Sequence, residues 1–161
     1  MQLELVAVIV EEYDSAIEFF VDRLGFELVE DSPSLTNDGR PKRWVVVRPA
    51  GAATGVLLVR ADGDQRIAVG GQFAGRVGFF LRVDDFDAAY ERMTSAGVEF
   101  LTSPRVETYG RVAVFADIAG NRWICRDRRK ASYQGRARPS RKQPPRLVGE
   151  VAVHGDDTLR R

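Results

Sequence analysis

The sequence predicts an α+β fold built from two tandem βαβββ modules. The first reason is an internal repeat, in which residues 10–14 match residues 83–87 at an offset of 73 and, after a one-residue gap, Gly25 matches Gly97. The segment 43–51 resembles 111–120 in the same order. The second reason is that strand and helix patterns follow one another identically in both copies. Agreement at three places indicates two copies of one unit.

Each copy opens with a short apolar run rich in β-branched residues, at 3–10 or 77–83, which predicts a strand. A helix is expected next, because apolar residues fall at i, i+3, i+4 and i+7 in both copies: Ile17, Phe20, Val21 and Leu24, then Phe86, Ala89, Tyr90 and Met93. Asp14 and Asp87 suit the start of these helices, and Gly25 and Gly97 suit a left-handed C-terminal cap. Three strands should close each copy, at 26–31, 43–48 and 55–60, then at 98–102, 111–116 and 122–126. Residues 61–75 are interpreted as the linker.

Length and composition set the class of protein. The chain has 161 residues, the size of one domain, with 44% hydrophobic and 29% charged residues. No apolar stretch is long enough for a membrane span, and the N-terminus does not resemble a secretory signal. The single Cys125 agrees with a reducing compartment, so a cytoplasmic location and no membrane partner are expected.

Charge divides the chain into two parts. Residues 126–161 carry 11 Lys and Arg against 4 acids, whereas residues 1–125 carry 13 against 19. The basic segment is rich in Pro, Gly and Ser and poor in apolar residues, which is typical of disorder. We therefore expect a folded domain over 1–127, with modules at about 3–60 and 76–127, and a basic, disordered tail over 128–161.

Three motifs make the chain resemble the vicinal-oxygen-chelate superfamily, which includes glyoxalase I, extradiol dioxygenases and bleomycin-resistance proteins. They are DSAIEFFVDRLGFELVED at 14–31, VDDFDAAYERMTSAGVEF at 83–100 and the turn FADIAGNRW at 115–123. The resemblance covers about residues 3–127. It implies that the two modules form a curved mixed sheet, with helices on the convex side and the ligand in a concave cup.

The resemblance also implies four metal-ligand positions, two from each copy. They fall on Leu5, Leu57, Gly78 and Ile124, none of which offers a carboxylate, imidazole or thiolate donor. No metal and no other cofactor are therefore expected. The one histidine, His154, lies in the tail, and Cys125 is interpreted as a small buried hydrophobe.

Alternation along the strands predicts which side chains line the cup. Trp44 and Tyr109 are added because they lie near strand starts, where an aromatic side chain can flank the entrance. The predicted ligand-binding residues are Leu5, Trp44, Leu57, Gly78, Phe80, Arg82, Tyr109, Arg122 and Ile124. Such an apolar floor with arginines at the rim suits a small, partly apolar or anionic molecule. Gly55 and Gly78 favour an open pocket, and the alternative is that the apolar residues fill the cup as core.

Three functions follow from this site and this tail. The favoured one is metal-free binding of a small molecule, similar to the bleomycin-resistance branch, in a chain whose apolar segment 3–10 makes a homodimer plausible. The alternative is an enzyme of lyase, isomerase or dioxygenase type with a non-standard site, for which Tyr109, Arg82, Arg122 and Glu107 are candidates but no catalytic residue is assigned. The third is nucleic-acid binding through the basic tail, where only Tyr133 can stack on a base.

Overall fold

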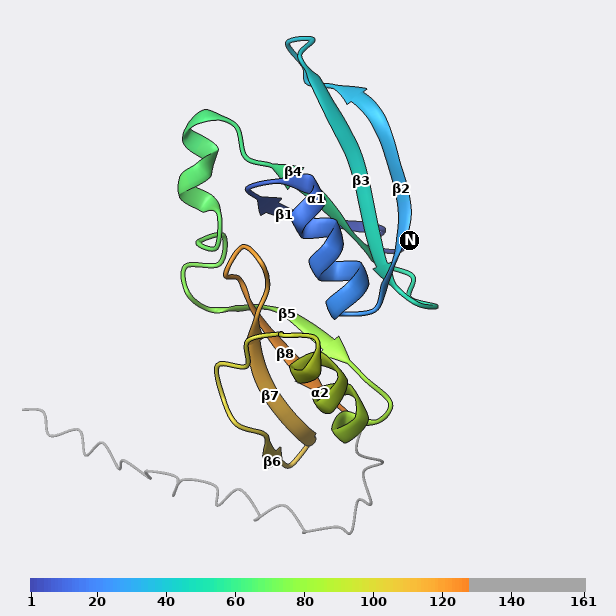
Figure 1. The fold of residues 1–161 in the computed structure, drawn as a ribbon, viewed down its shortest axis with the longest axis vertical. Helices are drawn as coiled ribbons and strands as arrows, with labels where there is room; N and C mark the ends of the chain where they lie inside the picture. The colour runs from blue at the N-terminus through green and yellow to red at the C-terminus, as the bar shows by residue number, and fades with distance from the viewer. Residues whose placement is uncertain (128–161) are drawn as a thin grey trace, which may run out of the picture. The chain divides into compact units, whose positions relative to one another are not determined.

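Two four-stranded mixed sheets make up the computed structural model, which describes residues 1–127 (Figure 1). The first module contains β1 (Leu5–Val10), α1 (Tyr13–Glu18), η1 (Phe19–Arg23), β2 (Phe26–Leu35), β3 (Pro41–Pro49) and β4 (Gly55–Arg60). The second contains β5 (Val77–Arg82), α2 (Phe86–Ser95), β6 (Arg105–Glu107), β7 (Gly110–Ala116) and β8 (Arg122–Arg126). The element order confirms the α+β fold with two βαβββ modules.

The two sheets have the same topology. Their strand orders are β1-β4-β3-β2 and β5-β8-β7-β6. In each sheet the first strand pairs in parallel with the last, and the remaining neighbours are antiparallel. The internal repeat seen in the sequence is therefore a repeat of topology as well.

The strand expected at 98–102 does not form, and this prediction was wrong. Only an isolated bridge joins Phe100 to Phe115, and the edge strand is the shorter β6. The Thr102 hydroxyl oxygen accepts the amide N–H of Val114 at 3.0 Å, while the amides of Leu101 and Thr102 both donate to the Val114 carbonyl. These bonds use the groups that a regular ladder would need, so pairing resumes only after Pro104.

The first helix is not a single α-helix. After α1 the chain forms one π-helical segment, η1, in which the amide of Leu24 donates to the carbonyl of Phe19 at 3.1 Å. Phe19 and Phe20 are both buried at the start of this segment. Gly25 and Gly97 end the two helices with φ of +75° and +79°, as the sequence predicted.

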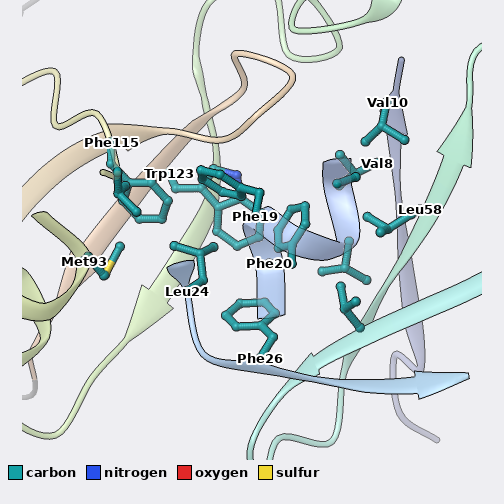
Figure 2. Close-up of a cluster of buried hydrophobic side chains, with 14 of the residues drawn as sticks. Val8, Val10, Phe19, Phe20, Leu24, Phe26, Leu58, Met93, Phe115 and Trp123 are labelled. Carbon is teal, nitrogen blue, oxygen red and sulfur yellow. The ribbon is translucent and has the colours of Figure 1, made fainter. Parts of the chain in front are cut away.

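The core lies on the helix-covered side of each sheet. Alternate side chains such as Val8, Val10 and Leu58 are buried there. The core continues from one module to the other, because the ring centroids of Phe20 and Trp123 lie 5.8 Å apart (Figure 2). The Arg92 guanidinium on α2 also donates to the carbonyls of Arg23 and Leu24, at the end of η1.

The segment 61–75 is ordered against both modules. It contains a 3-10 helix, η2 (Gly63–Ala68), capped by Asp62 and Gln65. Further along, the Gln72 side chain donates to the Ala7 carbonyl at 2.8 Å and accepts the Ile9 amide at 3.1 Å. The linker thereby occupies the free edge of β1.

Among residues 1–127, no helix has both the length and the apolarity needed to cross a membrane. The predictions about the basic tail, His154 and Tyr133 concern residues outside the described part of the chain.

Candidate functional site

The face of the first sheet opposite to α1 carries an apolar surface that the chain leaves partly exposed. We call it the first open face. Because α1 covers Val8, Val10 and Leu58, alternation and the strand register place the intervening side chains on this face. They are Leu5, Ala7, Ile9, Trp44, Val46, Arg48, Gly55, Leu57 and Val59.

A cavity of about 370 Å³ lies on the first open face. It is lined by Glu4, Leu5, Val29, Glu30, Trp44, Val46, Arg48, Ala53 and Gly55. Two predicted ligand-binding residues, Leu5 and Trp44, thus meet in one cavity. Arg48 is half-buried, and its Nε–H, which has almost no exposed surface, has no hydrogen-bond acceptor among the described residues. The cavity therefore combines an aromatic ring, aliphatic side chains and an arginine side chain.

A second cavity, of about 400 Å³, is lined by residues of both modules. It includes the predicted residues Phe80 and Arg82 of β5, with Trp123 and the segment 49–52. Asp84 and Thr54 add polar groups to its lining. Sequence reasoning placed Phe80 and Arg82 in one cup with Leu5, but the two cavities each hold only part of that set.

The remaining predicted residues line neither of these two cavities. Leu57 lies on the first open face, whereas Gly78, Arg122 and Ile124 belong to β5 and β8 of the second sheet. Tyr109 precedes β7, and its ring lies 5.5 Å from the guanidinium carbon of Arg126. Phe80 and Tyr109 are 66% and 47% exposed, so these side chains are available to a ligand or to another surface.

Gly55 and Gly78, the two glycines expected to leave the pocket open, have different surroundings. Gly55 lines both cavities, and a Cβ there would come within 3.0 Å of Leu5 and 3.2 Å of Val46. At Gly78, a Cβ would come within 2.3 Å of the Phe73 ring. Phe73, which belongs to the linker, therefore occupies the space next to Gly78. The prediction that Gly78 leaves the pocket open was wrong.

The positions that the family resemblance assigns to a metal do not suit one. Leu5, Leu57, Gly78 and Ile124 provide no donor atom on the faces of the two sheets. Within the part of the chain that the structure describes, no group of three or more His, Cys, Asp or Glu side chains is placed to hold an ion. The residues at these four positions thus do not fit a divalent metal.

The structure shows the surroundings of two reactive groups, the Cys125 thiol and the Glu107 carboxylate. Cys125 is fully buried, and burial raises the pKa of its thiol to about 11. This confirms the interpretation of Cys125 as a small hydrophobe, since the nucleophilic thiolate is disfavoured. The Glu107 carboxylate forms an ion pair with Arg105 at 2.9 Å.

The sequence analysis did not single out Arg48, Gln72 or Phe73, which contact the sheets or line the first cavity. Arg48 follows Trp44 and Val46 at a spacing of two, so strand alternation alone would have placed it on the same face. Gln72 and Phe73 carried no comparable signal, because the contacts of a linker depend on the tertiary fold.

The fold and the match to known sequences define the family. A family model described as the Glyoxalase/Bleomycin resistance protein/Dioxygenase superfamily matches residues 2–124. The chain therefore belongs to this superfamily, as the motifs and the paired modules indicated.

The chain is also similar to individual proteins and to solved structures. An uncharacterized protein of Shewanella frigidimarina (strain NCIMB 400) is 44% identical over 120 residues, which cover 73% of this chain and 87% of the relative. The crystal structure of TnmS3, an antibiotic binding protein from Streptomyces sp. CB03234, is 31% identical with a TM-score of 0.64, covering 80% of this chain and 96% of that one. The crystal structure of UcmS2 is 28% identical with a TM-score of 0.65, covering 78% and 97%.

Proposed function

We propose that this protein binds a small, partly aromatic molecule without a metal ion and sequesters it, in the manner of the bleomycin-resistance branch. The observation that carries the proposal is the cavity on the first open face, which is lined by Trp44, by aliphatic side chains and by Arg48. An apolar cavity with a few convergent polar groups is the usual form of a small-molecule site. The similarity to TnmS3, an antibiotic binding protein, supports the same class of function.

The proposal includes a homodimer in which a second copy covers the exposed apolar surface. Leu3 and Phe80 are 63% and 66% exposed. Exposed apolar side chains mark an interface where they form a contiguous patch. In the dimer, a second copy packs on the surface around Leu3 and Phe80. Residues 1–127 form the binding domain, residues 128–161 are an appendage, and the single buried cysteine suits the cytoplasm.

The metal-free part of the proposal rests on residue chemistry. Two leucines, an isoleucine and a glycine stand at the positions that the resemblance assigns to metal ligands. Binding must then come from apolar contact, stacking and hydrogen bonds. Catalysis of the metal-dependent type found in the superfamily is the alternative that a tightly bound ion would support.

Thermal unfolding with a panel of ligands and metals tests the function. The protein is freed of metal with a chelator and heated with aromatic carboxylates, aromatic amides, planar antibiotics, or Ni²⁺, Zn²⁺, Mn²⁺ and Fe²⁺. We expect at least one aromatic compound to raise the melting temperature, with stabilisation of about 2.7 kcal/mol at a concentration of 100 Kd. Stabilisation by one metal ion per chain, and by no organic compound, would reject the proposal and favour an enzyme.

A further inference from the structure

The Arg48 side chain differs from the other arginines of the first module in lacking an acidic partner. Ion pairs within residues 1–127 engage Arg23, Arg40, Arg43, Arg60, Arg105 and Arg111. Glu27 lies opposite Arg48 in the β2–β3 register, yet the two form no ion pair. The buried Nε–H of Arg48 also has no acceptor in the described part of the chain. A buried donor without an acceptor is costly, so its retention calls for an explanation.

A ligand in the cavity can reach Arg48 through the exposed part of its half-buried side chain, and the surroundings indicate which kind of ligand fits. Trp44, Val46 and Arg48 alternate on β3 and line the same cavity. Gly55 and Leu5 lie on the neighbouring strands and line it too. A flat molecule in this cavity can contact the Trp44 ring while an oxygen at its end reaches Arg48.

Arginine favours one kind of oxygen group. Its planar guanidinium donates two parallel hydrogen bonds to a carboxylate, and such charge-assisted bonds are shorter and stronger than neutral ones. Two carboxylates, of Glu4 and Glu30, also line the cavity. Both residues are exposed, and Glu30 accepts a hydrogen bond from the Ser32 hydroxyl at 2.8 Å. Because both carboxylates are exposed, water screens their repulsion of a bound anion.

We infer that Arg48 is the specificity-determining residue of this cavity and that it selects aromatic ligands carrying a carboxylate. The inference rests on the proposed small-molecule function and goes beyond it, because it names the ligand class and the group that recognises it. Arg82 and Arg122, which the sequence suggested as anion clamps, lie outside the cavity on the first open face.

Isothermal titration with naphthoate and with its neutral analogue naphthamide tests the inference on the full-length protein. We expect wild type to bind naphthoate more tightly than naphthamide. Arg48→Met should weaken naphthoate at least tenfold and leave naphthamide within twofold, whereas Glu30→Gln should strengthen naphthoate. Arg66→Met is the matched control, because Arg66 lies on η2 away from the cavity, and it should change neither affinity.

Urea unfolding of the unliganded protein distinguishes a role of Arg48 in ligand recognition from a structural role. Arg48→Met removes an unpaired donor and should leave the urea midpoint unchanged or raised. Equal naphthoate affinity in wild type and Arg48→Met would overturn the inference, and so would loss of both ligands together. If naphthoate fails while other compounds stabilise wild type, the carboxylate selection is wrong and the binding function stands. If no organic compound binds wild type, the binding function itself fails, and this inference fails with it.

Discussion

The indole N–H of Trp123 donates to the carboxylate of Asp117 at 2.9 Å, and this bond ties the turn 117–121 to the core shared by the two modules. The same carboxylate accepts the backbone amides of Ala119 and Asn121 at 3.0 and 2.9 Å. Trp123 stacks on Phe79 at a centroid distance of 4.2 Å and lies close to Phe20 of the first module. One buried acid therefore positions a ring on which both modules pack.

Asp117→Ala should destabilise the protein by about 2–4 kcal/mol, because it leaves several buried donors without an acceptor. Urea unfolding followed by tryptophan fluorescence measures the change. Asp64→Ala removes an exposed acid on η2 and should cost less than about 0.5 kcal/mol. Similar unfolding free energies for both variants would contradict the role given to Asp117.

Gln72 protects the free edge of β1 through its two side-chain hydrogen bonds to Ala7 and Ile9. Gln72→Ala should cost about 1 kcal/mol and speed hydrogen exchange at the Ile9 amide, which loses its acceptor. Gln65→Ala is the matched control, since its bonds are confined to the cap of η2. Unchanged protection of the Ile9 amide in Gln72→Ala would show that the linker does not hold this edge.

Phe80→Glu should convert the proposed dimer to a monomer, because a charge would replace an apolar ring that the second copy buries. Sedimentation velocity on wild type and variant at equal concentration measures the change. Ile67→Glu provides the comparison: Ile67 is 90% exposed on η2 and is not expected to be covered. A monomeric wild type would refute the dimer, whatever the variants do.

Stability should fall as the pH rises above about 9, in part because of Cys125. Burial raises its pKa from 9.0 to about 11, so between these values the unfolded chain loses the thiol proton while the folded chain retains it. The unfolded state is then favoured increasingly as the pH rises through this window, and the contribution is absent below it. Unfolding free energies at pH 8 and pH 10.5 should decline less in Cys125→Ala than in wild type. An equal decline would mean that this thiol does not contribute.

The fold was predictable because the signals that specify it are local and occur twice. The apolar runs at 5–10 and 77–82, and the glycines that follow both helices, appear at matching places in each copy. The strand expected at 98–102 failed because the Thr102 side chain takes a backbone partner, and periodicity cannot reveal such a bond. The π-helical segment at 19–23 was not predicted either, since the i, i+3, i+4 pattern assumes regular turns.

The candidate site was predictable only in part. Leu5 was predicted from the family's ligand positions and Trp44 from its place near a strand start, and the two share a cavity. Alternation applied to β3 would have added Arg48. Phe73, which fills the space at Gly78, comes from a segment interpreted as a plain linker. How a linker packs depends on contacts far apart in the sequence, so no local pattern predicts it.

The most direct test of metal-free aromatic binding at the first open face uses the two tryptophans of the chain. Uniformly ¹⁵N-labelled protein, treated with a chelator, is titrated with naphthoate while the two indole N–H resonances are followed. We predict that the Trp44 signal shifts saturably, whereas the Trp123 signal, hydrogen-bonded to Asp117 in the core, stays in place. A Trp44 signal that does not move up to millimolar naphthoate would contradict aromatic binding at this face.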